Sequence, residues 1–271
     1  MTDRVGQTAL DRALEDEEQL VLLYQPIHDA RTGAIYAAEA LLRQRRQTGE
    51  LREASIIHEA AEESRGSELF ELDHILVRKA YTDAARWQSF APGVRLNVNL
   101  SPRELQEGNV IDRLTALVSS CGIDTRAVNI EITETAYIKD PRATEKTLQM
   151  LKELGVGLWL DDFGTGHSAI DHLLHFPIDG IKLPGAFVKP LPADERCRAI
   201  TGNLIALAHD LKLAVVAEEV EREDQLEFLL EHGCDYIQGF LFSRPMAAED
   251  LEQLLWTALP GNTERAAVPD P

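Results

Sequence analysis

Residues 156–168, VGLWLDDFGTGHS, contain an apolar run that stops at two adjacent carboxylates, Asp161 and Asp162, and continues into a glycine-rich turn. A short apolar run bounded by turn residues is typical of a buried strand. Two neighbouring aspartates repel each other, and aspartate is uncommon inside strands. The stretch therefore predicts a strand whose polar end is either solvated or held by a positive group.

Similar apolar runs alternate with segments of helical periodicity along the chain. The other predicted strands are residues 20–25, 34–42, 94–99, 128–133, 180–183, 213–219 and 236–242, and the predicted helices are 54–65, 68–87, 103–121, 141–154, 167–175, 194–211, 222–232 and 248–258. Two helices have clear start signals, SPRE at 101–104 and DPRATE at 140–145. Eight strands that alternate with helices over about 250 residues favour an α/β fold of the (β/α)8 barrel type, with a doubly wound open sheet as the alternative.

The length of 271 residues and the 44% hydrophobic content suit one barrel-sized domain. We expect this domain to span residues 20–258, preceded by an acidic helical segment at 1–19 and followed by a flexible tail at 259–271.

The net charge of −19 argues against a DNA or RNA polymer and against an anionic membrane as partners. No apolar run is long enough to cross a bilayer. The three cysteines lack metal-ligand spacing, which is typical of reduced thiols in a cytoplasmic protein.

Polar side chains lie at or near the ends of nearly all predicted strands. They are Gln25, Glu39, Asn99, Glu131, Asp161, Asp162, Lys182, Glu218 and Gln238. In a barrel, the C-terminal strand ends meet at one mouth, where the active site lies. So many carboxylates would repel one another unless a hard divalent ion such as Mg²⁺ or Mn²⁺ joined them. No histidine lies at these strand ends, which argues against zinc.

The adjacent aspartates suggest two ions. Asp161 is expected to face the barrel axis while Asp162 turns above it, so that Asp161 contacts both ions and Asp162 only the second. Two ions about 3.5 to 4 Å apart are typical of in-line displacement at phosphorus. Lys182 would assist the phosphoryl oxygens or the attacking water, and Glu218 is a candidate proton acceptor.

Eight motifs, in order, resemble those of the EAL domain family from about residue 20 to residue 258. They are YQPI (24–27), EALLR (39–43), NVNLSPREL (97–105), EITET (131–135), DDFGTGHSAI (161–170), IKL (181–183), AEEVE (217–221) and QGFLFSRPM (238–246). The resemblance implies a modified TIM barrel with one reversed strand and a phosphodiesterase that converts cyclic di-GMP to linear pGpG with Mg²⁺ or Mn²⁺. It also implies that a homodimer is possible.

The same resemblance implies a role for each matching residue. Glu39, Asn99, Glu131 and Asp161 would hold the first ion, and Asp161 and Asp162 the second, with Glu218 as base or water-mediated ligand. Lys182 would orient the attacking water. Substrate contacts are implied for Gln25, Leu41, Arg43 and Gln238, of which Gln238 would also support the ion network. Glu134 and Glu221 would support loops.

Three positions depart from the family pattern. KLP replaces the usual KID, so Pro184 stands where an aspartate is expected, and Glu219 replaces a glycine in AEEVE. We expect the second ion to be bound more weakly as a result, because proline offers no carboxylate. His167 replaces a tyrosine, with an effect that the sequence does not predict.

These departures keep a second function open, in which a catalytically weak or inactive EAL domain acts as a cyclic di-GMP receptor or as a protein-interaction module. An enolase-type lyase would also place carboxylates on consecutive strands, but it gives no account of QGF and AEEVE together. A protein kinase is excluded, because no glycine-rich loop or HRD segment accompanies DFG.

Overall fold

A computed structural model describes residues 10–11, 14–46, 48–54, 57, 68–106, 108–133, 141–166 and 169–259. Its strands are β1 (Leu20–Asp29), β2 (Ile35–Arg45), β3 (Leu51–Glu53), β4 (Arg95–Asn99), β5 (Val128–Thr133), β6 (Gly157–Asp161), β7 (Gly180–Leu183), β8 (Ala214–Ala217) and β9 (Tyr236–Ile237). The α-helices are α3 (Glu68–Gln88), α4 (Pro102–Leu105), α5 (Val110–Cys121), α6 (Pro141–Glu153), α7 (Ala169–His175), α8 (Gly185–Val188), α9 (Glu195–Asp210), α10 (Glu223–Glu231) and α11 (Ala248–Thr257). Two short 3₁₀ helices are η1 (Glu17–Gln19) and η2 (Thr125–Ala127).

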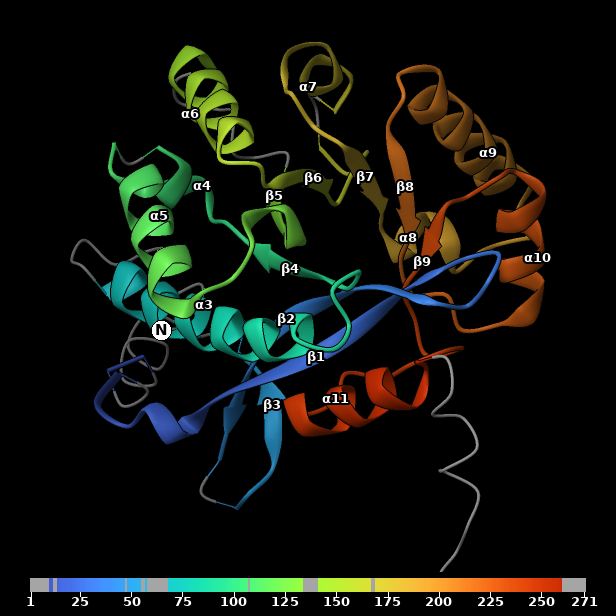
Figure 1. Cartoon of the computed structure of the whole chain (residues 1–271). Coiled ribbons are helices and arrows are strands. Elements are labelled where there is room, and N and C mark those ends of the chain that lie inside the picture. Colours follow the sequence, from blue (N-terminus) through green and yellow to red (C-terminus); the bar gives the residue numbers. More distant parts are fainter. Residues whose placement is uncertain are drawn as a thin grey trace, which may run out of the picture.

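Eight of these strands close into a barrel with helices around its outside (Figure 1). The hydrogen-bonded order is β1-β9-β8-β7-β6-β5-β4-β2, the pairing of β1 with β2 closes the ring, and β3 extends β2 as a hairpin arm. Strand β1 is antiparallel to both neighbours, whereas β2 and β4 to β9 pair in parallel. The barrel is confirmed over the open sheet, and the reversed strand that the resemblance implied is present.

Local sequence signals explain where several elements begin. Ser101 caps α4, because its hydroxyl accepts a hydrogen bond from the Glu104 N–H at 3.2 Å and Glu104 accepts one from the Ser101 N–H at 3.3 Å. The tight turn between β1 and β2 is held by Asp29, which accepts hydrogen bonds from the N–H groups of Arg31 and Thr32, and Gly33 supplies a φ of 71°. The SPRE start signal is therefore confirmed.

Some predicted boundaries were wrong. The single helix at 103–121 is two helices, α4 and α5, since Gly108 lies in the break and glycine disfavours a helix interior. The strand at 236–242 ends at Ile237, because a Cβ on Gly239 would lie 2.1 Å from the Val220 carbonyl oxygen and the chain turns away from the ladder. Residues 1–9, 260–271 and most of the helix expected at 54–65 lie outside the described residues.

An apolar layer fills the barrel interior near the N-terminal ends of the parallel strands. Ile27, Ala37, Trp159 and Val216 form one buried cluster, separate from the larger core between barrel and helices. Ala37, Trp159 and Val216 each lie two residues before a carboxylate on the same chain segment, so they point inward one layer below it. This layer fills part of the barrel interior beneath the polar strand ends.

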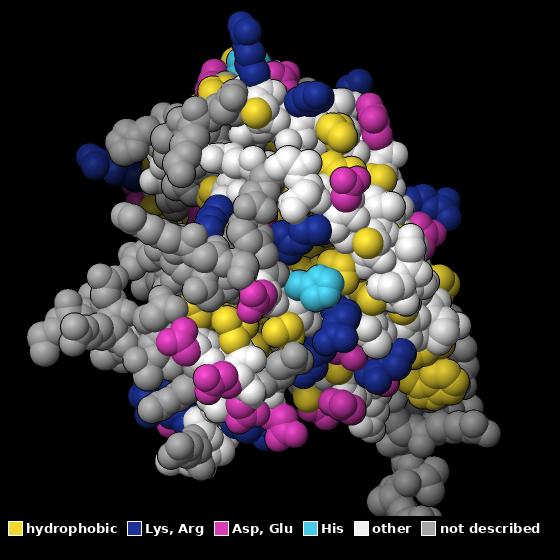
Figure 2. All heavy atoms as spheres, turned by 90° about the vertical axis from the view of Figure 1, so that its left-hand side faces the viewer, with side chains coloured by type: hydrophobic (Ala, Val, Ile, Leu, Met, Phe, Trp, Pro, Cys, Tyr) yellow, Lys and Arg dark blue, Asp and Glu magenta, His cyan; other side chains and the backbone are white. Residues whose placement is uncertain are grey.

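The surface drawn in Figure 2 carries acidic and basic side chains interspersed with apolar ones. The excess of acidic residues is thus not spread over this face as a uniformly negative surface. Among the helices that the structure describes, none combines the length and the apolar character needed to cross a membrane.

The apolar layer depends on glycine at position 180. A Cβ there would lie 2.4 Å from Cζ3 of Trp159 and 2.7 Å from the backbone oxygen of Ala214. We expect Gly180→Ala to lower the free energy of unfolding by about 1–3 kcal/mol through overpacking, measured by urea denaturation. Gly93→Ala is the matched control, because a Cβ at Gly93 meets no atom within 4 Å. Equal stability of the two variants would contradict this account of the layer.

Candidate functional site

Lys182 of β7 lies at the centre of four carboxylates. Its side chain is 1% exposed. Its Nζ lies 2.7 Å from Glu218 Oε1, 2.9 Å from Glu131 Oε2, 3.2 Å from Glu39 Oε2 and 3.4 Å from Asp161 Oδ1. These four residues are called here the carboxylate ring. Glu39 lies on β2, Glu131 on β5 and Asp161 on β6, and Glu218 directly follows β8. The structure thus brings together side chains from five positions around the barrel.

The ring sets the protonation of its members. Burial would lower the pKa of Lys182, but Asp161, Glu131, Glu218 and Glu39 hold it well above its ordinary value. Burial raises the pKa of Glu218 to about 7, although Lys182 opposes this shift. Burial also raises the pKa of Glu131, with a further contribution from Glu39. One lysine cannot neutralise four carboxylates, so the site retains an affinity for cations.

Glu39 is oriented by two amides as well as by the lysine. Gln238 Nε2 donates to Glu39 Oε2 at 2.8 Å, and Asn99 Nδ2 donates to Glu39 Oε1 at 3.3 Å. Burial would raise the pKa of Glu39, yet Lys182 and these hydrogen bonds bring it below its ordinary value. Glu39 is therefore an anion in a nearly dry position.

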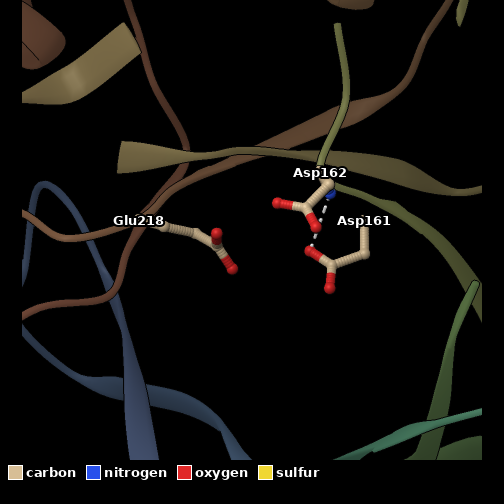
Figure 3. A group of neighbouring side chains, drawn as sticks. All are labelled: Asp161, Asp162 and Glu218. Atoms are coloured by element: carbon tan, nitrogen blue, oxygen red, sulfur yellow. Dashed lines mark hydrogen bonds between the residues drawn. The ribbon is translucent and has the colours of Figure 1, made fainter. Parts of the chain in front are cut away.

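Asp161, Asp162 and Glu218 form a close group of carboxylates in this part of the barrel (Figure 3). One ligand oxygen from each lies within 4.8 Å of the other two. Asp162 adopts a left-handed φ of 53°, and its N–H donates to Asp161 Oδ1 at 2.9 Å. This turn directs both aspartates toward Glu218, whereas simple strand alternation would separate them.

The donor set fits a hard divalent cation. Mg²⁺ holds oxygen ligands at about 2.1 Å, so that opposite ligands are about 4.2 Å apart. Small side-chain rotations would bring the oxygens of Asp161, Asp162 and Glu218 to such distances from their present spacing of at most 4.8 Å. All the ligand candidates offer oxygen, which suits Mg²⁺ or Mn²⁺.

The remaining predicted residues lie farther along the same elements. Gln25 on β1 pairs with Glu39 across the ladder, and its Nε2 donates to the Ser243 carbonyl at 3.3 Å. Leu41 and Arg43 follow on β2 and are partly buried. Glu221 lies in the loop after β8, where its N–H donates to Gln225 Oε1 at 2.9 Å. Glu134 and His167 lie outside the described residues.

Two of the three departures from the family pattern, Pro184 and Glu219, lie side by side. Pro184 precedes α8, and Glu219 has a left-handed φ of 55°, which normally favours glycine. The Glu219 carboxylate forms an ion pair with Lys189 and lies over Gly185, where a Cβ would be 2.2 Å from Glu219 Oε1. The Asp161, Asp162 and Glu218 group forms without a carboxylate at position 184.

Asn97 also belongs to the site, although it was not predicted from the sequence. Its Nδ2 donates to Glu131 Oε1 at 2.6 Å from a fully buried position. The signal was available, since Asn97 and Asn99 are two residues apart and therefore share one face of β4.

A model of the EAL domain matches residues 7–245 of the chain. Two similar proteins from Pseudomonas aeruginosa are named as cyclic di-GMP phosphodiesterases. PA2567 is 34% identical over 92% of this chain and 42% of its own length. NbdA is 35% identical over 91% of this chain and 31% of its own length. The signalling protein YkoW of Bacillus subtilis is 31% identical over 94% of this chain and 32% of its own length. The chain thus spans between 31% and 42% of the length of these three curated relatives.

Solved structures show the same architecture. The phosphodiesterase domain PaMucR, in complex with c-di-GMP, has a TM-score of 0.84 at 31% identity and covers 90% of this chain and 99% of its own. The EAL enzyme Bd1971, with cAMP and cyclic di-GMP bound, has a TM-score of 0.87 at 25% identity. The match covers 93% of this chain and 69% of the Bd1971 chain.

The acidic group predicts stabilisation by divalent ions. Mn²⁺ at 100 times its Kd should stabilise the fold by about 2.7 kcal/mol by mass action, seen as a higher Tm. Asp162→Asn should lose the part of this increase that comes from the second ion, because a carboxylate ligand is replaced by a neutral amide. Asp210→Asn, at the exposed end of α9, should keep it. An unchanged response of Asp162→Asn would exclude Asp162 as a ligand.

Glu218 predicts a pH dependence of metal binding. A carboxyl whose pKa is about 7 is protonated below that pH and must lose its proton before it approaches a cation. Mn²⁺ affinity, measured by calorimetry on the metal-free protein, should therefore be constant above pH 7 and fall roughly tenfold for each pH unit below it. Glu218→Gln should bind Mn²⁺ more weakly and with a smaller dependence on pH. A wild-type affinity that does not change through pH 7 would show that Glu218 takes no part in binding.

Proposed function

The chain belongs to the EAL domain family, and we propose that it is a metal-dependent phosphodiesterase that hydrolyses cyclic di-GMP to linear pGpG. The observation that carries this proposal is the carboxylate ring around buried Lys182, together with the acidic group of Asp161, Asp162 and Glu218. The named activities of PA2567 and NbdA, and the c-di-GMP complex of PaMucR, support the choice of substrate.

The cofactors would be two Mg²⁺ or Mn²⁺ ions. Glu39, Asn99, Glu131 and Asp161 would hold the first ion, and Asp161 and Asp162 the second, with Glu218 close to it. Such a pair of ions supplies charge neutralisation at the phosphate and activation of water.

The chain's own side chains account for water activation and proton transfer. Lys182 has three N–H donors, which Glu218, Glu131 and Glu39 share in this structure. One of these donors would orient the water beside the ring when the carboxylates hold the ions. Glu218, with a pKa of about 7, suits the acceptance of a proton from that water at neutral pH. Attack on phosphorus breaks the bond to the 3′ oxygen, which gains a proton and leaves pGpG with its 5′ phosphate.

Substrate binding would involve the β1–β2 hairpin and the loop after β9. Gln25 is already anchored to the Ser243 carbonyl of that loop. Leu41, Arg43 and Gln238 would complete the contacts to guanine and phosphate. The possible homodimer and the cytoplasmic location expected from the sequence stay predictions.

The alternative function, a cyclic di-GMP receptor or protein-interaction module with weak or no turnover, depends on Pro184 and Glu219. The acidic group supports the hydrolase, because Asp161, Asp162 and Glu218 approach one another without a carboxylate at position 184. We therefore prefer the enzyme.

The test is to incubate the purified protein with cyclic di-GMP and Mn²⁺ and to measure pGpG by liquid chromatography. We expect product from the wild type and a loss of at least about 100-fold in Glu39→Ala, which removes an ion ligand and leaves Lys182 and Gln238 without a shared partner. Glu231→Ala, at the exposed end of α10, should retain activity. Tight nucleotide binding with no pGpG would favour the receptor instead.

A further inference from the structure

A line of hydrogen-bonded polar side chains leads from the carboxylate ring into the barrel. It consists of Asn97, Asn129 and Arg95 and is called here the file. Asn97 Nδ2 donates to Glu131 Oε1 at 2.6 Å, and Asn129 Nδ2 donates to Asn97 Oδ1 at 2.9 Å. Arg95 Nη1 donates to Asn129 Oδ1 at 3.2 Å. Both asparagines are 0% exposed. These residues lie on the neighbouring strands β4 and β5, where Asn97 pairs directly with Asn129.

The direction of every hydrogen bond in this file is determined by Arg95 at its end. A guanidinium can only donate, so each amide in turn accepts through its oxygen and donates through its nitrogen. Arg95 therefore faces the amide oxygen of Asn129, and the amide nitrogen of Asn97 faces Glu131. Each amide is left with one orientation, and the bonds polarise one another along the file.

The barrel leaves space for this file through Gly157 of β6. A Cβ at position 157 would lie 2.3 Å from Asn129 Oδ1 and 3.5 Å from Arg95 Nη1. Asn129 pairs with Gly157 across the sheet, so any larger side chain would push the amide away from Arg95. The file thus occupies a gap that a missing side chain provides.

Glu131 is the residue that the file controls. Its carboxylate is fully buried, with Oε1 bound by Asn97 and Oε2 by Lys182 at 2.9 Å. Two donors from different strands fix both the position and the plane of the carboxylate. Without Asn97, one buried oxygen would lose its donor, and the carboxylate would be free to rotate about its terminal bond.

We propose that Asn97, held by Asn129 and Arg95, is a positioning residue that fixes Glu131 for the first divalent ion. The inference rests on the metal site of the proposed function and adds three residues that support it from below. Partners of metal ligands commonly change metal affinity by about 10- to 100-fold when removed. The competing explanation is that the file only stabilises the barrel interior.

The test measures Mn²⁺ binding directly, by electron paramagnetic resonance of free Mn²⁺, together with Tm and the rate of pGpG formation. Asn97→Ala should weaken Mn²⁺ binding about tenfold and leave the KM for cyclic di-GMP unchanged. Arg95→Met changes only the partly buried end of the file, so it can be measured even if Asn97→Ala does not fold. We expect Arg95→Met to weaken Mn²⁺ binding about threefold. Asn203→Ala, on the exposed side of α9, is the matched control.

The double variant Asn97→Ala/Asn129→Ala separates positioning from stabilisation. If Asn129 acts through Asn97, the double variant should bind Mn²⁺ no more weakly than Asn97→Ala alone. Folded variants with lower Tm and wild-type Mn²⁺ affinity would overturn the inference in favour of a structural role.

The outcomes also distinguish this inference from the proposed function. If the wild type binds Mn²⁺ but makes no pGpG, the proposed function fails, and weaker Mn²⁺ binding by Asn97→Ala still supports the inference. If the wild type makes pGpG and Asn97→Ala binds Mn²⁺ normally, only the inference fails. A wild type that binds no Mn²⁺ overturns both.

Discussion

The ammonium of Lys182 lies in the barrel with four carboxylates within 3.4 Å and almost no contact with water. Burial of an unpaired charge costs several kcal/mol, so neither the lysine nor the carboxylates would be tolerated here alone. The pairing explains why such a charged group persists inside the barrel. It also holds the carboxylates close together, which is the condition that a divalent ion requires.

The barrel supplies the geometry on which this pairing depends. Strand β1 runs against its neighbours and closes the ring, which places Glu39 of β2 beside Gln238 after β9. The apolar layer around Trp159 excludes water from below. Above it, the left-handed turn at Asp162 adds a carboxylate at the mouth. Interior packing and the polar site are therefore successive layers of the same strands.

Much of the fold and site could be predicted from the sequence, because strand periodicity and polar strand ends are local signals. The alternation of apolar runs predicted the barrel, and the ends of those runs predicted Glu39, Glu131, Asp161, Lys182 and Glu218. Local signals do not report which strands pair, so the reversal of β1 came only from the family resemblance. They also gave no reason for the early end of β9, which depends on the close approach of Gly239 to Val220.

The supporting file was not predicted because an asparagine within a strand reveals neither its depth in the barrel nor its partner. Asn97 and Asn129 become informative only when β4 and β5 are placed side by side. The same holds for Glu219, whose ion pair with Lys189 joins two loops.

Anomalous diffraction from a crystal soaked in Mn²⁺ shows whether the ring and its neighbouring aspartates form a divalent metal site. We expect one Mn²⁺ peak among Asp161, Asp162 and Glu218 and a second beside Glu39 and Glu131. An ordered site with no anomalous peak within ligand distance of these carboxylates would contradict this expectation.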